Sequence, residues 1–235
     1  MKQYRGDLHI HTTLSPCGSL EMTPLSIILR AKELGWDFIA ITDHNDTRQA
    51  PIIKELGQEH HITVFMGAEI CSKEEVHLLS IVGTESARLR LQNYLTENRI
   101  KVTNNPEYFG DQVVVNKKEE IVIEEKNLLL TALNKDVYDI CNYIHQIGGL
   151  VIASHINRLS YSILSTMGSI PDDLPIDAVE ISDPQFPPLG QYCMIHNNDA
   201  HYMEDLKENH SLYTMKDLSF YSLKECILNH QIQII

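Results

Sequence analysis

The chain has 235 residues and a formal net charge of −13 at pH 7, and its 43% apolar and 22% charged residues are typical of a globular protein, not a disordered or fibrous one. This acidic balance argues against sequence-independent binding to nucleic acid, which relies on clustered Lys and Arg, so we expect no stable nucleic-acid partner. Excess negative charge suits a cation-binding protein, although it serves solubility equally well.

Short apolar runs alternate with stretches of helical periodicity, which is the pattern of repeated βα units. In chain order, we predict strands over residues 4–9, 38–42, 63–66, 76–82, 150–154, 178–181 and 192–195. Helices are predicted over residues 24–34, 47–57, 85–98, 135–147, 161–167 and 222–230, the first with Thr23 as its N-cap. These units predict an α/β fold, a distorted TIM-like barrel of seven βα units in one domain over residues 1–235.

Residues 99–126 interrupt this alternation of strands and helices. Two β-rich runs, 112–116 and 120–124, flank the polar segment Lys117-Lys118-Glu119. Strand-forming runs separated by a short polar turn predict a β-hairpin. We therefore expect a small hairpin insertion within the barrel.

The first predicted strand ends in the segment Asp7-Leu8-His9-Ile10-His11. Side chains alternate between the two faces of a strand, so Asp7, His9 and His11 are expected to point the same way. Two imidazoles at this spacing can chelate one ion, and a nearby carboxylate can orient an imidazole through its second nitrogen.

Other predicted strands also end in polar residues. Asp43-His44-Asn45, Glu69 and His155 each follow an apolar run, and Asp199 and His201 follow another with the same spacing as His9 and His11. The carboxyl ends of barrel strands are where α/β barrels place their catalytic groups. The sequence therefore predicts a metal site at this end of the barrel.

Six segments in this order resemble the motifs of the PHP (polymerase and histidinol phosphatase) family: Asp7-Leu8-His9-Ile10-His11-Thr12, Thr42-Asp43-His44, Gly67-Ala68-Glu69, His77-Leu78-Leu79, Ala153-Ser154-His155 and Asn198-Asp199-Ala200-His201. The resemblance runs from residue 7 to 201. It implies a seven-unit barrel with up to three divalent ions (zinc, manganese or iron) and phosphoesterase activity.

The resemblance also implies how the ligands are shared among the ions. One ion would be held by His9, His11, Glu69 and Asp199. Glu69 would bridge to a second ion bound by His77 and His155. The third ion would be held by His44 and His201.

Three residues of this set stand apart. Cys17 lies where family members often have Asp or His, so its thiolate would complete the third site and favour zinc or iron over manganese; a small buried Cys in a turn is the alternative. His77 begins an apolar run instead of ending one, so the pattern by itself places it away from the site. Arg158 is a candidate phosphate clamp, or else a surface residue closing a loop.

Three further carboxylates lie near these motifs. We expect Asp7 and Asp43 to orient ligand histidines instead of binding metal. Glu180, at the end of the strand over 178–181, is either a partner of a ligand or a carboxylate at the edge of the core, and we favour the second interpretation.

The resulting hypothesis is a hydrolase that cleaves a small-molecule phosphate monoester, as histidinol phosphatase does, by attack of a metal-bound hydroxide. Glu69, Asp199 and Arg158 are the residues expected to act in catalysis. One alternative is a phosphodiesterase or exonuclease acting on nucleotides or oligonucleotides. Another, of a different class, is a metal-binding regulatory module without activity.

The remaining features concern location and partners. No segment approaches the ~18 consecutive apolar residues of a membrane span, so we expect a cytoplasmic protein with no membrane partner. The five cysteines are widely spaced without a C-x-x-C pair, which predicts reduced thiols. The expected partner is a small phosphorylated substrate, and the sequence predicts neither its identity nor the oligomeric state.

Overall fold

The computed structural model describes all residues, 1–235. Its strands are β1 (Lys2–Ile10), β2 (Phe38–Ile41), β3 (Thr63–Cys71), β4 (His77–Val82), β5 (Val113–Val115), β6 (Ile121–Glu124), β7 (Leu150–Ala153), β8 (Ala178–Ile181), β9 (Met194–His196), β10 (Ser211–Met215) and β11 (Ile232–Ile234). Its helices are α1 (Pro24–Glu33), α2 (Ala50–His60), α3 (Glu85–Asn98), α4 (Pro106–Phe109), α5 (Val137–Gln146), α6 (Ile163–Met167), the 3-10 helix η1 (Met203–Asp205) and α7 (Phe220–Leu228).

Side-chain caps define where most helices begin. The hydroxyl of Thr23 accepts a hydrogen bond from the Ser26 N–H at the start of α1, which confirms the predicted cap. Helix α2 was predicted to end at Gly57 but continues to His60. Gly57 serves close packing instead, because a Cβ there would lie 2.6 Å from the carbonyl oxygen of Ile62.

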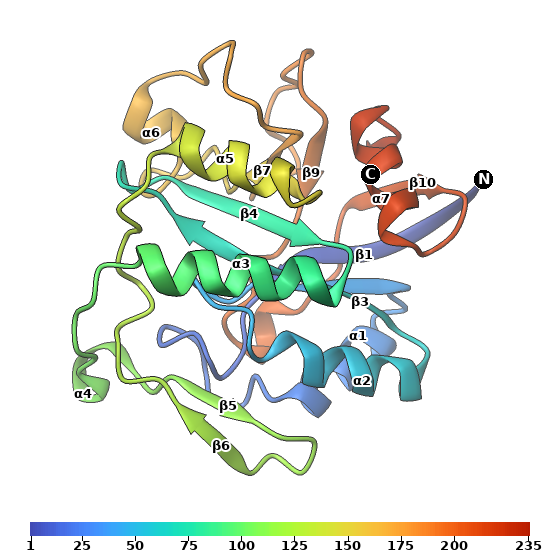
Figure 1. Cartoon of the computed structure of the whole chain (residues 1–235). Helices are drawn as coiled ribbons and strands as arrows, with labels where there is room; N and C mark the ends of the chain where they lie inside the picture. The colour runs from blue at the N-terminus through green and yellow to red at the C-terminus, as the bar shows by residue number, and fades with distance from the viewer.

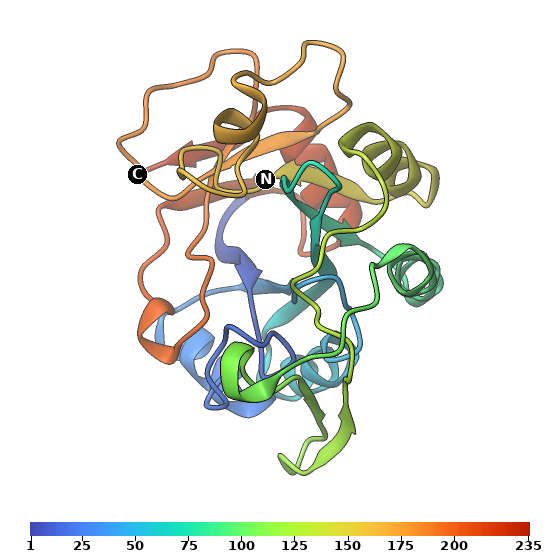
Figure 2. The same cartoon turned by 90° about the vertical axis from the view of Figure 1, so that its left-hand side faces the viewer.

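Nine strands form one sheet in the order β11-β10-β1-β2-β3-β4-β7-β8-β9, and β5 pairs with β6 in a separate hairpin. The sheet curls into a nearly closed barrel with helices on its outside (Figures 1 and 2), and the hairpin projects from it. The predicted distorted barrel with a hairpin insertion is therefore confirmed.

Strand direction differs from that of a regular barrel in one central place. Strands β1, β2 and β3 are parallel, as are β7, β8 and β9, but β4 is antiparallel to both neighbours, β3 and β7. The prediction also missed β10 and β11, which extend the sheet beyond β1 through antiparallel pairs. Both mix polar and apolar residues (Ser-Leu-Tyr-Thr-Met and Ile-Gln-Ile), so they lack the continuous apolar run that marks β2 and β7 in the sequence.

The barrel closes where β1 meets the segment after β9. Ile10 forms a parallel bridge with Ala200, and the side chain of Asn197 accepts a hydrogen bond from the Leu8 N–H at 2.9 Å. Asp7 adds a contact across the same seam, accepting from the Asn198 N–H at 2.9 Å. No continuous strand ladder joins these two segments, so hydrogen bonds from the side chains of Asn197 and Asp7 help to close the barrel.

The interior of the barrel is divided into an apolar end and a polar end. The first residues of β2, β7 and β8, namely Phe38, Leu150 and Ala178, belong to one buried cluster with Leu223 and Ile227 of α7. Helix α7 therefore packs against the end of the barrel where the parallel strands begin. The opposite end is left to the polar side chains.

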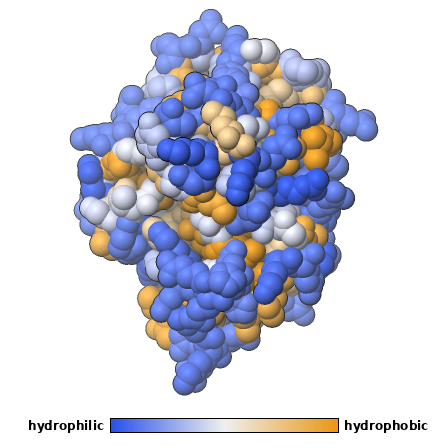
Figure 3. Space-filling view, turned by 90° about the vertical axis from the view of Figure 1, so that its right-hand side faces the viewer, coloured by the Kyte–Doolittle hydropathy of each residue, from blue (hydrophilic) through white to orange (hydrophobic).

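The face of the molecule in Figure 3 is mostly hydrophilic. On the face in Figure 3, which lies opposite the one in Figure 2, hydrophobic residues form small separate patches. No helix has both the length and the apolar character needed to cross a membrane.

Substituting Gly67 tests the close approach of β3 and β4. A Cβ at Gly67 would lie 2.1 Å from the carbonyl oxygen of Ser80, so Gly67→Ala has to separate the two strands. We expect a loss of about 1–3 kcal/mol in the free energy of unfolding, measured by urea denaturation. The control Gly190→Ala, which has no atom within 4 Å of its added Cβ, should change it by less than about 0.5 kcal/mol. Equal midpoints for the two variants would contradict this packing constraint.

Candidate metal centre

Eight predicted ligands meet at the polar end of the barrel. They come from the ends of parallel strands, from the segments that follow them and from the start of β4: His9, His11, His44, Glu69, His77, His155, Asp199 and His201. All but His201 are buried. The structure thus brings together side chains separated by almost 200 positions in the sequence.

Glu69 lies at the centre of this cluster. Its carboxylate is 1% exposed and lies within 3.5 Å of five imidazoles: His77 Nδ1 (2.9 Å), His155 Nε2 (3.1 Å), His44 Nδ1 (3.1 Å), His9 Nε2 (3.3 Å) and His11 Nε2 (3.5 Å). Burial by itself would raise the pKa of Glu69, but the surrounding histidines hold it well below its usual range. Glu69 is therefore ionised and able to bridge cations.

His77 reaches this cluster because of the direction of β4. It is the first residue of an antiparallel strand, and the first residue of such a strand lies beside the last residues of its parallel neighbours. The position that the sequence pattern placed away from the site is therefore at the site, with His77 Nδ1 2.9 Å from Glu69. A pattern read along one strand does not reveal the direction of that strand.

Asp199 forms the second carboxylate of the cluster. Its Oδ1 lies 3.1 Å from Nε2 of both His9 and His11, and its Oδ2 accepts a 2.5 Å hydrogen bond from Arg158. Burial would raise the pKa of Asp199, but His9 and His11 lower it far below its usual value. Asp199 also has a positive φ of 50°, in the left-handed region, which Asp adopts more readily than most non-glycine residues.

The donor atoms fall into three compact groups. The first is the predicted set of His9, His11, Glu69 and Asp199; the second contains His44, Glu69 and His77; the third contains His11, His44 and His201. His155 lies outside the second group, although its Nε2 is 3.1 Å from Glu69. Cys17 belongs to none of them and lines the adjoining cavity. Burial, together with nearby carboxylates, raises the pKa of its thiol.

Hydrogen bonds on the outer ring nitrogens orient the two histidines of β1. Ser15 donates its only hydroxyl hydrogen to Asp43 at 2.7 Å, so it accepts from His11 Nδ1 at 2.9 Å. Glu180 accepts from His9 Nδ1 at 2.9 Å. Both rings therefore direct Nε2 toward the carboxylates, as metal-binding imidazoles do.

This donor set fits divalent cations. His9 Nε2 and His11 Nε2 are only 3.1 Å apart, and both face ionised carboxylates. Burial would lower the pKa of each ring, yet the carboxylates raise the pKa of His9 well above its usual value and that of His11 to about 9. The cluster therefore attracts positive charge, which protons or metal ions can supply. The buried Nδ1 of His155 also has no hydrogen-bond partner.

Two expectations about carboxylates were wrong. Glu180 is fully buried and holds His9, so it is not merely a residue at the edge of the core. The sequence feature that could have indicated this role is the position of Glu180 near the end of an apolar strand. Asp7 accepts from the backbone N–H of His9 and Asn198, and not from an imidazole.

A β-bulge lies in the part of β1 that contains His9, between Asp7 and Ile10. On β1, Asp7 pairs with Ile39 and Ile10 pairs with Ile41, so β1 uses one more residue than β2 over this stretch. The bulge interrupts the strict alternation assumed from Asp7 to His11. Asp43 does act on a ligand histidine, but indirectly through Ser15.

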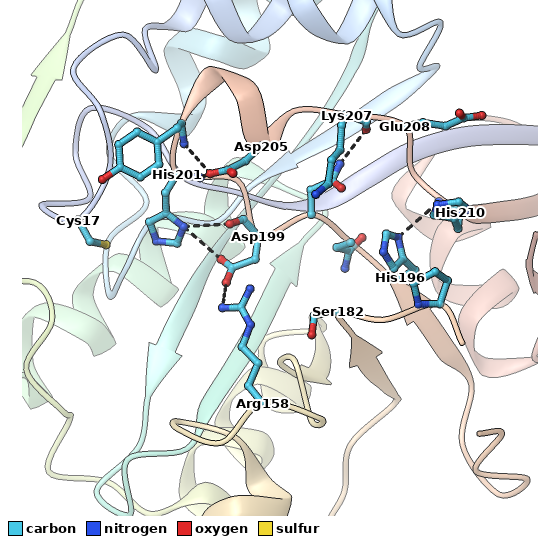
Figure 4. Close-up of a pocket in the computed structure, with 14 residues that line it drawn as sticks. Cys17, Arg158, Ser182, His196, Asp199, His201, Asp205, Lys207, Glu208 and His210 are labelled. Atoms are coloured by element: carbon cyan, nitrogen blue, oxygen red, sulfur yellow. Dashed lines mark hydrogen bonds and ion pairs between the residues drawn. The ribbon is translucent and has the colours of Figure 1, made fainter. Parts of the chain in front are cut away.

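Two cavities open onto the cluster. The larger has a volume of about 740 Å³ and the smaller about 250 Å³, and both are lined by Cys17, Arg158, Asp199 and His201. The smaller also reaches Glu69. In the larger cavity, Arg158 extends toward Asp199, while His196 and His210 lie on the far side (Figure 4).

The sequence profile of the PHP domain family matches residues 7–167. The chain belongs to the PHP domain family. The resemblance drawn from the six motifs is thereby confirmed, and it places the chain in a family of metal-dependent phosphoesterases. An uncharacterised protein from Methanocaldococcus jannaschii is 38% identical over 79 residues, which are 30% of this chain and 46% of that protein.

Solved structures share the fold over nearly the whole chain. The lesion-specific endonuclease PfuEndoQ from Pyrococcus furiosus superposes with a TM-score of 0.73 at 19% identity, covering 99% of this chain and 58% of that one. A proposed metal-dependent phosphoesterase from Bifidobacterium adolescentis superposes with a TM-score of 0.62 at 16% identity, covering 97% and 96%. The chain thus spans little more than half of the endonuclease.

A further structure corrects the expected partners. Endonuclease Q in complex with a 27-mer duplex superposes with a TM-score of 0.71 at 19% identity, covering 97% of this chain and 57% of that one. The expectation of a small phosphorylated partner and no stable nucleic-acid binding is therefore wrong. It relied on net charge, which averages over the whole surface, whereas a phosphate backbone is bound by local positive charge.

Glu180→Gln tests the role of Glu180 in holding His9. The amide lacks the negative charge that fixes the His9 ring, so zinc affinity should fall by about 10–100-fold, as for other residues that orient metal ligands. Competition with a chromophoric zinc chelator measures this, with the exposed Glu204→Gln as the matched control. Unchanged affinity in Glu180→Gln would show that this hydrogen bond does not orient a ligand.

Proposed function

We propose that this chain is a metal-dependent phosphodiesterase that cleaves a nucleic-acid strand. The observation that carries the proposal is the meeting of two cavities at Arg158 and Asp199. A phosphodiester has a substituent on each side of its phosphorus, so a site that opens in two directions suits it. The monoester expected from the sequence has one substituent and would leave one cavity unused.

The ligand cluster would hold up to three divalent ions. His9, His11, Glu69 and Asp199 would bind one; His77, His155 and Glu69 a second; and His44 and His201, with Cys17 nearby, a third. Imidazole and carboxylate donors suit zinc, iron and manganese. Such ions lower the pKa of water toward neutrality and neutralise charge on the phosphoryl group.

Side chains of the protein would bind the phosphate and orient the attacking water. Arg158 is 41% exposed and contacts Asp199 Oδ2, so part of its guanidinium is free to bind a phosphoryl oxygen. Asp199 is the carboxylate that lines both cavities, and its depressed pKa keeps it ionised to orient the attacking water. Glu69 is ionised for the same reason and keeps the imidazoles together.

The fold of endonuclease Q supports a nucleic-acid substrate, because that enzyme is solved with a DNA duplex and shares the barrel. The presence of all eight His, Glu and Asp donors at one site argues against a regulatory module that has lost its activity. A module released from selection for catalysis would be expected to have lost some of them.

Removing a central ligand tests the link between metal and activity. Glu69→Ala and His9→Ala should lose bound metal and turnover together, by at least about 100-fold in kcat, because each removes a donor from the cluster. Elemental analysis and hydrolysis of bis-p-nitrophenyl phosphate measure the two losses. Glu225→Ala, on the exposed side of α7, is the control. A metal-free variant that keeps full activity would refute the proposal.

A substrate panel tests diester against monoester chemistry. With zinc, manganese or iron, kcat/KM should be at least about tenfold higher for bis-p-nitrophenyl phosphate and short oligonucleotides than for p-nitrophenyl phosphate and histidinol phosphate, because only diesters occupy both cavities. The reverse order would show a monoesterase. Hydrolysis of none of them would favour the regulatory module.

A further inference from the structure

The larger cavity extends well beyond the metal ligands. We call its distant part the polar arm and define it by Ser182, His196, Asn197, Asn198, Lys207 and His210. None of these residues is among the predicted metal ligands. The polar arm begins beside Arg158 and Asp199, so whatever it binds lies next to the phosphate that is cleaved.

Two buried amide atoms in the polar arm have no partner within the protein. They are Nδ2 of Asn197, a residue that is 2% exposed, and Oδ1 of Asn198. The orientation of each amide is determined by its other atom: Asn197 Oδ1 accepts from the Leu8 N–H at 2.9 Å, and Asn198 Nδ2 donates to the Lys207 carbonyl at 2.9 Å. Both residues line the larger cavity, so the polar arm contains one unpaired hydrogen-bond donor and one unpaired acceptor from adjacent residues. Leaving such buried atoms unpaired costs about 1–3 kcal/mol each.

Lys207 is the one lysine or arginine of the polar arm, and the two nearby carboxylates of the same cavity have partners of their own. Glu208 pairs with Arg5 at 3.5 Å, and Asp205 accepts from the backbone N–H of His201 and Tyr202. These two carboxylates are thus already engaged. Lys207 remains as the cation of the polar arm, away from the ligand cluster.

Two histidines give the polar arm an aromatic wall. The rings of His196 and His210 meet edge to face, with centroids 5.1 Å apart. His196 Nδ1 accepts from the His210 N–H at 3.4 Å, which fixes the first ring against the second. An aromatic face next to amide donors and acceptors is suited to a nucleobase, since bases stack and offer both kinds of hydrogen-bonding group.

We propose that the polar arm binds the nucleoside adjacent to the scissile phosphodiester, with Asn197 Nδ2 and Asn198 Oδ1 as its donor and acceptor, His210 as its stacking surface and Lys207 as the partner of the next phosphate. This inference rests on the proposed function, because it assigns one side of a cleaved diester. The polar arm would let the site select substrates that carry a nucleoside, because metal ions by themselves do not distinguish one phosphate ester from another.

The test compares two substrates with the same leaving group. Thymidine 5′-p-nitrophenyl phosphate carries a nucleoside, whereas bis-p-nitrophenyl phosphate does not. Wild-type protein should prefer the first by at least tenfold in kcat/KM. Asn197→Asp retains the oxygen that accepts from Leu8 but replaces the donor with an acceptor, so the ratio of the two kcat/KM values should fall about tenfold.

A binding measurement gives a readout independent of turnover. Thymidine 3′,5′-bisphosphate is titrated calorimetrically into metal-free protein in EDTA. Asn197→Asp and Lys207→Ala should each weaken binding by about tenfold, whereas Lys126→Ala, an exposed lysine beyond β6, should not. Should Asn197→Asp fail to fold, Lys207→Ala decides, since it leaves the contact between Asn197 and Leu8 in place.

The outcomes separate the two proposals. Failure to cleave bis-p-nitrophenyl phosphate would refute the proposed phosphodiesterase activity, whether or not thymidine 3′,5′-bisphosphate binds. Cleavage without a nucleoside preference, or a preference and bisphosphate affinity unchanged in both variants, would overturn the polar arm as a nucleoside site. Loss of preference and of affinity in the variants supports it.

Discussion

The site depends on one buried carboxylate. Glu69 is almost completely shielded from water, and an ionised carboxylate in such a place is stable only when positive charge or hydrogen-bond donors surround it. Five imidazoles from β1, β4 and the segments after β2 and β7 provide that surrounding. The same imidazoles that make the buried charge tolerable form, with Glu69, donor groups that could hold metal ions, so the stability of this end of the barrel would depend on bound metal.

The barrel places its charged cluster and the apolar packing against α7 at opposite ends. Apolar residues at the start of the parallel strands pack against α7, while the charged side chains gather where those strands end. Positive φ angles at Asn45, His155 and Asp199 lie at the charged end.

Net charge is a poor guide to the partners of a protein of this kind. The chain carries −13 overall, yet the cavities at the polar end of the barrel contain Arg158 and Lys207 and adjoin groups of His, Glu and Asp that could hold metal. Phosphate groups respond to the local potential in a cavity, where nearby low-dielectric walls strengthen it. A large negative total is therefore compatible with a phosphate-containing polymer at the site.

The sequence by itself determined the barrel class, the hairpin and most of the clustered residues, because each of those signals is local: an apolar strand followed by a polar residue, or two strands flanking a turn. Only the tertiary structure decided the roles of Asp7 and Glu180, and only it explains how His77, placed among the ligands by the family resemblance alone, reaches the site. The direction of β4 brings His77 to the site, the closure between β1 and the segment after β9 places Asp7 against backbone N–H groups, and the closeness of β8 to β1 places Glu180 against His9. Strand direction, register and contacts between distant segments depend on pairing across the sheet, which no single stretch of sequence encodes.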